Sequence, residues 1–598
     1  MIRYSLEIFN NIGTLLTKLP IVLIAASFSY GIVNATSGLR RRTEGKAVFN
    51  AFFCVCILAL ILIGFAYLSQ YSGFKTVFNI PVSIIGIHLL LNLLFLIGIR
   101  LLISSMHQRM QTDRAQYGKR RRQILIYGAG RFGRATHDAI IKDSKSNIEL
   151  LGFIDDNAEK IGTKIHGLDA YGIQHITTEF IKTHGLDEVY ISIQNISSER
   201  LLDITKHFLS TSIHVKIVPL LEHWIDGDLK VGQIKDVNIE DLLGRGRINI
   251  VNPLLIDEYK DNVILVSGAA GSIGSEIARK LSHFNYKKLI LVDIAESPLY
   301  ELQQEFIQNE VERFEVIIAD VRTVIRMDQL FSKYKPDIVF HAAAYKHVPL
   351  MENNPYEAVS VNVGGTINLA NISVKHKVKK FVMISTDKAV NPTNVMGATK
   401  RIAELYMSCL HKTETTKFIT TRFGNVLGSN GSVIPLFEKQ IEHGGPVTVT
   451  DKDITRFFMT ITEACELVLE AAAMGSGGEI YVFDMGKSVK IYDLALHMIM
   501  LSGLRYPKDI AIKIIGLRPG EKIDEELLAE GEIAKPTLHE KIMIAKSRPI
   551  NSDVTNQILK LKEVNAHCKT LETVSIIKDI VPEYISNNSK FEVLDAKK

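Results

Sequence analysis

Three consecutive residues, Thr386, Asp387 and Lys388, carry a hydroxyl, a carboxylate and an amine. The apolar run 381–384 before them is typical of a strand, and residues 400–406 after them are typical of a helix. In an open α/β sheet, ligands bind at the edge where such strands end. An acid beside a base suits a reaction that both removes and donates protons. A solvated polar loop is the alternative, and a nucleotide motif earlier in the same domain argues against it.

That motif is a glycine-rich turn. The apolar run 263–267 leads into Gly268, Gly271 and Gly274, and a helix is expected to follow. Such glycines permit a tight turn and close approach of a pyrophosphate, which the N–H groups at the helix N-terminus then face. A second strand ends at Asp293, about 20 residues further on, where an acid binds the ribose hydroxyls of NAD. Because a carboxylate would repel a 2′-phosphate, the sequence predicts NAD rather than NADP.

Further motifs follow in a fixed order. They lie at 268–276, 320–322, 341–349, 385–404, 422–429, 455–460 and 516–522. Together they resemble the large membrane-bound nucleotide-sugar 4,6-dehydratases of bacterial polysaccharide and glycan biosynthesis, a group of the extended short-chain dehydrogenase/reductase superfamily. The similarity covers nearly the whole chain and is densest between residues 263 and 527.

The resemblance implies two Rossmann-like doubly wound α/β domains, the second a catalytic domain at 261–598 with a C-terminal substrate-binding part. It implies NAD, held tightly and regenerated in each turnover. Asp320 would bond the adenine amino group, and Lys400 would bond the nicotinamide ribose. The cofactor-binding residues it implies are Gly268, Gly271, Ser272, Ile273, Gly274, Asp293, Asp320, Val321, Ala342, Ala343 and Lys400.

The Y-x-x-x-K pair of the superfamily appears here as Met396 and Lys400, which is the pattern of this dehydratase subgroup. No tyrosine at that position can act as the base, so the chemistry passes to Thr386, Asp387 and Lys388. By the resemblance, Thr386 would bind the C4 oxygen, Lys388 would take the C5 proton, and Asp387 would protonate the departing C6 hydroxyl.

The resemblance also implies a binding site for a UDP-sugar. A guanidinium pairs phosphate oxygens bidentately, which suits Arg456 and Arg518 to a diphosphate. Glu521 would accept a bond from a ribose hydroxyl, although residues 518–521 also fit an ordinary Pro-Gly turn. The substrate-binding residues expected are Lys346, His347, Arg422, Asn425, Val433, Arg456, Arg518 and Glu521.

The predicted function is NAD-dependent 4,6-dehydration of a UDP-N-acetylhexosamine, with UDP-GlcNAc as the family's usual substrate. A nucleotide-sugar 4-epimerase or 5-inverting dehydratase is one alternative, and a non-enzymatic nucleotide-binding membrane scaffold is another. A homo-oligomer and contact with later glycan enzymes are expected. The net charge of +5 gives no signal for nucleic acid, and the five scattered cysteines lack metal-ligand spacing, so no metal is expected.

Three apolar stretches, 19–35, 48–68 and 80–99, predict a transmembrane region at 1–110 with about three helices. Family members commonly have four. Basic residues at 40–46 and in the linker 111–122 place these segments on the cytoplasmic side by the positive-inside rule. The sequence thus predicts a multi-pass protein of the inner membrane with its catalytic domains in the cytoplasm.

A smaller Rossmann-like domain is predicted at 123–225, followed by a connector at 226–260. Its first strand, 123–127, runs into Gly128, Gly130 and Gly133. Because these glycines also serve close packing of helix on strand, NAD is not predicted here, and a regulatory ligand stays open.

Overall fold

The computed structural model divides the chain into two compact units, Met1–Arg121 and Arg122–Lys598. In the second unit it describes residues 122–597 except 144–146, 210, 212, 222–223, 225–227, 244–252, 412–415, 530–531, 533 and 546–552. In the first unit it describes residues 56–64, 67, 86–87, 90–91, 94 and 121.

No helix among these described residues is long and apolar enough to cross a membrane. This finding contradicts the predicted transmembrane helices and the predicted multi-pass location in the inner membrane. Most of the three apolar stretches, 19–35, 48–68 and 80–99, lies outside the described residues.

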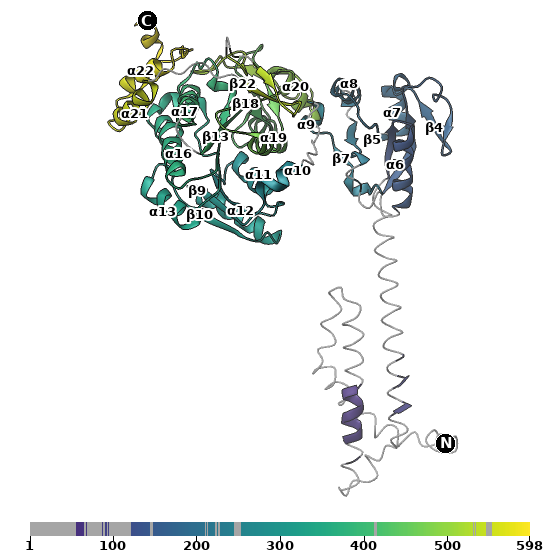
Figure 1. Ribbon diagram of the computed structural model, residues 1–598. Coiled ribbons are helices and arrows are strands. Elements are labelled where there is room, and N and C mark those ends of the chain that lie inside the picture. Colours follow the sequence, from purple (N-terminus) through teal and green to yellow (C-terminus); the bar gives the residue numbers. More distant parts are fainter. Residues whose placement is uncertain are drawn as a thin grey trace, which may run out of the picture. The chain divides into compact units, whose positions relative to one another are not determined.

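The smaller domain of the second unit is built on a seven-stranded sheet with the order β3-β4-β2-β1-β5-β6-β7 (Figure 1). The strands from β4 to β6 are parallel, and β3 and β7 are antiparallel edges. The strands are β1 (Arg122–Tyr127), β2 (Ile148–Ile154), β3 (Lys164–Ile165), β4 (Leu168–Tyr171), β5 (Leu186–Ile191), β6 (His214–Ile217) and β7 (Lys235–Asp236). The helices of this part are α6 (Arg131–Lys142), α7 (Thr178–His184), α8 (Ser198–Leu209) and α9 (Ile239–Leu242).

The larger domain of the second unit holds a nine-stranded sheet with the order β10-β9-β8-β11-β12-β13-β18-β22-β21. It is parallel from β10 to β18, and β22 and β21 add an antiparallel edge. The order reverses between β8 and β11, which is the doubly wound pattern, so the predicted Rossmann-like α/β fold is confirmed. The strands are β8 (Val263–Ser267), β9 (Lys288–Asp293), β10 (Phe314–Ile318), β11 (Ile338–His341), β12 (Lys380–Thr386), β13 (Lys417–Phe423), β18 (Ile480–Phe483), β21 (Ala534–Pro536) and β22 (Ile542–Ala545).

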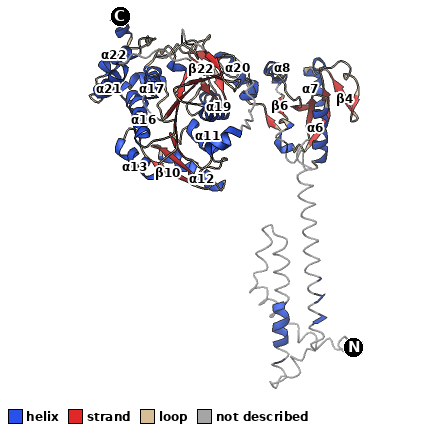
Figure 2. Ribbon diagram, in the orientation of Figure 1, coloured by secondary structure: helices blue, strands red, loops and turns tan. Residues whose placement is uncertain are grey.

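Helices cover both faces of this sheet (Figure 2). Successive strand side chains point to opposite faces. Leu265 therefore belongs to one core cluster, and its neighbours Ile264 and Val266 belong to the other. One face packs on α13 (Val324–Tyr334), α16 (Thr366–Lys375) and α17 (Val395–His411), and α21 (Val554–Asn565) and α22 (Thr570–Ile580) pack in turn on α17. The other packs on α10 (Pro253–Tyr259), α11 (Ser272–Leu281), α12 (Glu296–Gln308) and α19 (Ile461–Met474).

Short elements after β13 extend the carboxyl edge of the sheet. They are β14 (Asn425–Val426), α18 (Val433–Glu442), β15 (Val447–Val449), β16 (Thr455–Arg456), β17 (Phe458–Met459), β19 (Val489–Lys490), α20 (Ile491–Leu501) and β20 (Ile512–Ile514). Three two-stranded pairs, β14 with β17, β15 with β20 and β16 with β19, tie them together. They place charged residues of the last third of the chain over the ends of β12 and β13.

Candidate active site

A cavity of about 570 Å³ lies at the carboxyl edge of the nine-stranded sheet. Its size is in the range of ligand sites. The predicted site residues that line it are Gly268, Gly271, Ser272, Ile273, Gly274, Ala342, Lys346, His347, Thr386, Lys388, Met396, Lys400, Asn425, Val433, Arg456, Arg518 and Glu521. Residues from 268 to 525 of the sequence thus meet in one space.

Six predicted site residues are not among those that line the cavity: Asp293, Asp320, Val321, Ala343, Asp387 and Arg422. Asp293 is the last residue of β9, Asp320 and Val321 follow β10, and Ala343 lies directly against Gly268. Asp387 is fully buried behind Thr386 and Lys388, and Arg422 is fully buried elsewhere in the core.

The glycine turn after β8 leaves no room for larger side chains. Gly268 has a φ of +71°, and a Cβ there would lie 2.5 Å from the backbone N of Ala343. A Cβ on Gly274 would lie 2.0 Å from the carbonyl oxygen of Gly268. Helix α11 therefore packs directly on the turn, and its N-terminus at Ser272 faces the cavity.

The acids after β9 and β10 have internal partners. The Oδ2 of Asp293 accepts a bond from the Ala270 N–H at 2.9 Å, so this carboxylate braces the glycine turn. Asp320 pairs with the Arg322 guanidinium at 2.8 Å. Burial tends to raise the pKa of Asp320, but the bonds from Arg322 outweigh burial and lower it.

The three residues that open the sequence argument form one hydrogen-bonded unit at the end of β12. The Thr386 hydroxyl donates to Oδ1 of Asp387 at 2.8 Å, and the Lys388 ammonium donates to the same oxygen at 3.0 Å. Lys388 also donates to Oδ1 of Asn425 at 2.9 Å. A Cβ on Gly397 would lie 2.1 Å from the Lys388 carbonyl oxygen, so a glycine lets α17 approach this turn.

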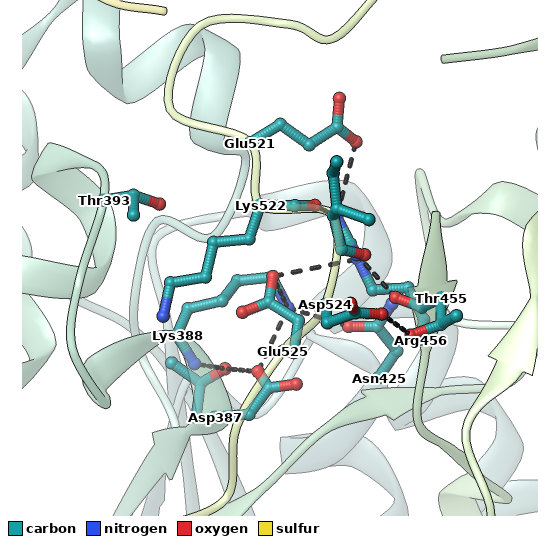
Figure 3. A network of polar contacts seen from close by, with 12 residues as sticks. Asp387, Lys388, Thr393, Asn425, Thr455, Arg456, Glu521, Lys522, Asp524 and Glu525 are labelled. Atoms are coloured by element: carbon teal, nitrogen blue, oxygen red, sulfur yellow. Dashed lines mark hydrogen bonds and ion pairs between the residues drawn. The ribbon is translucent and has the colours of Figure 1, made fainter. Parts of the chain in front are cut away.

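Opposing charges hold Lys388 in its ammonium form. Its Nζ lies 3.7 Å from Oε1 of Glu525 as well as 3.0 Å from Asp387 (Figure 3). Burial favours the neutral amine, but the two carboxylates outweigh burial and raise the pKa of Lys388 above its usual range. A base in this position must first lose a proton.

Glu525 is a site residue that the sequence argument missed. Its side chain is 4% exposed, lines the cavity and lies 3.7 Å from the Nε of Arg456. Burial raises its pKa, against the charge of Lys388. The run 524–526 holds three consecutive acids, and nothing in their spacing singles out the buried one. Only the fold reveals that Asp524 and Glu526 are exposed while Glu525 points inward.

Met396 and Lys400 line the cavity one helical turn apart on α17. Met396 is 3% exposed and presents an apolar side chain at this position, as the sequence requires. Burial lowers the pKa of Lys400 to about 8, although Glu404 opposes the change. Burial and, to a smaller extent, the charge of Lys400 lower the pKa of His341, at the end of β11, to about 3.

The two arginines predicted to bind the diphosphate, Arg456 and Arg518, differ in whether their guanidinium groups are already hydrogen-bonded within the protein. Arg456 is buried, and its guanidinium donates to the backbone oxygens of Thr455, Lys522 and Ile523. Arg518 is half-exposed and pairs with Glu521 at 3.1 Å. Of the two arginines, Arg518 is the one that can readily turn toward a phosphate.

Lys346 and His347 also line the cavity. The Lys346 ammonium lies 3.4 Å from the Ser429 hydroxyl. A Cβ on Gly431 would lie 2.6 Å from the His347 ring, so the glycine turn before α18 closes against this histidine. Desolvation and the charges of Lys346 and Arg518 lower the pKa of His347.

The structure does not bring Arg422 to the cavity. Its side chain is fully buried and pairs with Glu404 and Glu532, each at 2.8 Å. Arg401 binds the same Glu404 at 3.0 Å, and Ser385 donates to it at 2.7 Å. The Arg422 guanidinium is paired within this buried ion network. Its position at the end of β13 therefore does not bring it to the cavity.

One group outside the cavity has the composition of a metal site. Ligand atoms of His137, Asp138 and His166, in the smaller domain, lie within 4.8 Å of one another. The cysteine spacing could not reveal it, because the turn between β3 and β4 carries His166 to α6. The hydrogen bond from His137 to Asp138, at 3.0 Å, accounts for the contact of those two side chains without an ion.

Comparison with known proteins matches both domains. Residues 264–547 match the family model described as polysaccharide biosynthesis protein, and residues 30–219 match one described as CoA-binding domain. The capsular polysaccharide biosynthesis protein CapD of Staphylococcus aureus is 43% identical over 457 residues, which cover 76% of each chain. The probable polysaccharide biosynthesis protein EpsC of Bacillus subtilis is 41% identical over 482 residues, 80% of this chain and 79% of that one. A UDP-glucose 4-epimerase of Rickettsia rickettsii is 36% identical over 286 residues, 46% of this chain and 80% of that one.

The fold and the cavity together define a Rossmann-like α/β protein in which Thr386 and Lys388 line one cavity with a glycine-rich turn. The matches to CapD and EpsC cover about three quarters or more of each chain, and this extent shows which family the chain belongs to. The chain belongs to the polysaccharide biosynthesis protein family that contains CapD and EpsC.

Proposed function

We propose that the protein is an NAD-dependent nucleotide-sugar 4,6-dehydratase that acts on a UDP-N-acetylhexosamine, with UDP-GlcNAc as its first candidate. The observation that carries this proposal is the unit of Thr386, Asp387 and Lys388, which meets a glycine-cradled turn in one cavity. A 4,6-dehydration removes water from the sugar, and this elimination needs an acid, a base and a site for the nucleotide cofactor.

The residues present fit a dinucleotide. Gly268 and Gly274 leave no room for a Cβ, and the α11 N-terminus faces the cavity where a pyrophosphate would lie. Asp293 and Asp320 stand at the ends of the next two strands, where adenosine would lie. Lys400 would hold the nicotinamide ribose. When bound, NAD supplies hydride transfer, taking a hydride from C4 of the sugar and returning it to C6.

The geometry suggests a proton path for the first step. The Thr386 hydroxyl points its proton at Asp387, so Thr386 can accept the proton of the C4 hydroxyl and pass its own to the carboxylate. Asp387 then holds the proton that the C6 hydroxyl needs to leave as water. Lys388, once neutral, takes the C5 proton that the C4 ketone has made acidic. General acid–base steps of this kind are each worth about 10²–10⁴-fold.

Arg518, Glu521, Lys346 and Val433 would hold the UDP part, since all four line the cavity and none belongs to the glycine turn. The exposed Arg518 is the proposed diphosphate ligand. Expected partners are a UDP-sugar and a second copy of this chain.

A nucleotide-sugar 4-epimerase is the competing activity, and the similarity to the Rickettsia rickettsii protein favours it. An epimerase of this superfamily would use the tyrosine that Met396 replaces, and it would not need the Asp387–Lys388 pair. The dehydratase accounts for both features.

One assay separates these functions. The purified full-length chain is incubated with NAD and UDP-GlcNAc, and the products are resolved by NMR. A 4-keto-6-deoxy sugar nucleotide supports the dehydratase, and UDP-GalNAc would establish the epimerase. Absence of turnover with UDP-GlcNAc, UDP-GalNAc and UDP-glucose would refute both and leave the nucleotide-binding scaffold.

A further inference from the structure

Glu525 is a buried carboxylate beside the base of the proposed reaction. It follows the 516–522 motif in a loop that returns over the end of β12, and Figure 3 shows it between Lys388 and Arg456. Its Oε1 lies 3.7 Å from the Lys388 ammonium and 3.7 Å from the Arg456 Nε. The side chain is thus aimed at the reacting groups from an element far along the chain.

Two carboxyl oxygens around Lys388 are buried without a hydrogen-bond donor among the described residues. They are Oε2 of Glu525 and Oδ2 of Asp387. A buried charged oxygen without a donor is unfavourable, and a proton on it removes the charge. The site therefore holds two cations, Lys388 and Arg456, and two carboxyls that can take up a proton.

Lys388 must lose a proton to a neighbouring group before it can act as the base. Both neighbouring carboxylates keep it protonated, and an ammonium cannot accept the C5 proton. Asp387 is occupied in the proposed function, because it receives the C4 hydroxyl proton through Thr386. Arg456 cannot accept a proton, and Lys522, the remaining charged neighbour of Glu525, is a cation. Glu525 is the acceptor that remains.

Resting on the proposed dehydratase, we propose that Glu525 accepts a proton from Lys388 and so converts it into the neutral amine that removes the C5 proton. One N–H bond of Lys388 breaks and one O–H bond of Glu525 forms, which discharges the pair. A rotation of the lysine stem must shorten the 3.7 Å separation to about 2.8 Å. The amine then takes the C5 proton, and the C5–H electron pair moves toward the C4 carbonyl.

The cycle closes without an outside reagent. After hydride returns to C6, the Lys388 ammonium gives a proton back to C5, and Glu525 returns its proton to the amine. Asp387 has meanwhile passed the C4 hydroxyl proton to the departing C6 hydroxyl, which leaves as water. Glu525 acts through Lys388 and is a positioning residue in this scheme, since no step requires it to touch the sugar.

The test is Glu525→Gln, which keeps the shape but cannot take up a proton. Two half-reactions are measured with UDP-GlcNAc from pH 6 to 10: absorbance at 340 nm for C4 oxidation, and deuterium incorporation at C5 in D₂O. We expect C4 oxidation within about threefold of the wild type. C5 exchange should fall by about 10²-fold at pH 7. C5 exchange in Glu525→Gln should then recover as pH rises, because Lys388 in this variant can lose its proton only to solvent, and higher pH favours that loss.

Two variants control this result. Glu526→Gln changes the adjacent acid, which is exposed and accepts from Asn391, and should leave both half-reactions unchanged. Glu525→Asp keeps a carboxyl and should retain exchange at pH 7 above that of Glu525→Gln. This second variant also tests the proposal if Glu525→Gln fails to fold.

The inference is overturned if Glu525→Gln exchanges C5 within about threefold of the wild type at pH 7, if its deficit is the same at every pH, or if C4 oxidation is lost along with exchange. A wild-type protein that shows neither reduced cofactor nor C5 exchange would refute the proposed dehydratase itself. The two failures are therefore distinguishable.

Discussion

The Nζ of Lys388 lies 3.0 Å from Oδ1 of Asp387, so the proposed base and the proposed acid are joined in one ion pair. Their roles cannot be independent, because each sets the charge beside the other. Thr386 donates to the same Asp387 oxygen. The unit is compact because β12 ends at Thr386 and a single turn of 3-10 helix presents the next two residues.

Asp387→Asn and Lys388→Ala should each lower turnover by at least 10²-fold while the protein still binds NAD. The double variant should lose far less than the product of the two single losses, because residues that act as a unit are not additive. Steady-state kinetics and NAD titration of the three variants check this. Near wild-type turnover in either single variant would refute its assigned role.

Arg422→Ala should act on stability and not on substrate binding. Removing one partner of a buried ion pair leaves Glu404 and Glu532 charged in the core, which costs about 3–5 kcal/mol. Arg518→Ala is the matched control, because its side chain is 52% exposed. It should leave the free energy of unfolding within about 0.5 kcal/mol and raise the KM for the UDP-sugar. Urea unfolding and kinetics separate these outcomes, and a stable Arg422→Ala protein with a raised KM would restore the sequence-based role.

The same network predicts acid sensitivity. Burial would raise the pKa of Glu404, but Arg422 and Arg401 lower it from 4.5 to about 2. Because the folded-state value is depressed, the stability that Glu404 contributes is present above pH 4.5 and is lost as pH falls toward 2. The free energy of unfolding, measured from pH 6 to 3, should fall more steeply in the wild type than in Glu404→Gln. Parallel pH profiles would contradict the assignment.

The parts of the site that lie within one βα unit could be predicted from the sequence. The strand, glycine turn and helix from 263 to 281 and the triplet after β12 were predicted because each lies within one βα unit, where periodicity and turn residues determine the geometry. Arg422 was predicted to bind substrate, whereas the structure pairs it with Glu532, 110 residues further along the chain, and no local pattern reports that contact. Glu525 was missed for the same reason, since only the return of the 516–528 segment over β12 gives it a role.

Met396→Ala tests the departure from the superfamily pattern. The side chain is 3% exposed and belongs to the core cluster under α17, so truncation should destabilise the fold by about 2–5 kcal/mol. It removes no acid or base, so C5 deuterium exchange should persist at temperatures where the variant is folded. Loss of exchange as complete as in Lys388→Ala, in a folded variant that binds NAD, would give Met396 a chemical role.

Lys400→Met should separate cofactor binding from stability. Lys400 is 6% exposed, and burial lowers its pKa from 10.5 to about 8, so at pH 7 the folded protein carries a charge that its surroundings disfavour. A depressed lysine pKa means that the unfolded chain binds more protons between about pH 8 and 10.5. The free energy of unfolding of the cofactor-free protein should therefore rise with pH across that window in the wild type. Methionine has a similar length and no charge, so the variant should be at least as stable at pH 7 and should lack this rise.

The Lys400→Met variant should also bind NAD at least tenfold more weakly, because the proposed partner of the nicotinamide ribose is gone. Chemical unfolding at pH 7 and pH 10, together with NAD titration by calorimetry, measures both effects. Unchanged NAD affinity would remove Lys400 from the cofactor site, and a variant less stable than the wild type at pH 7 would show that the ammonium stabilises the fold.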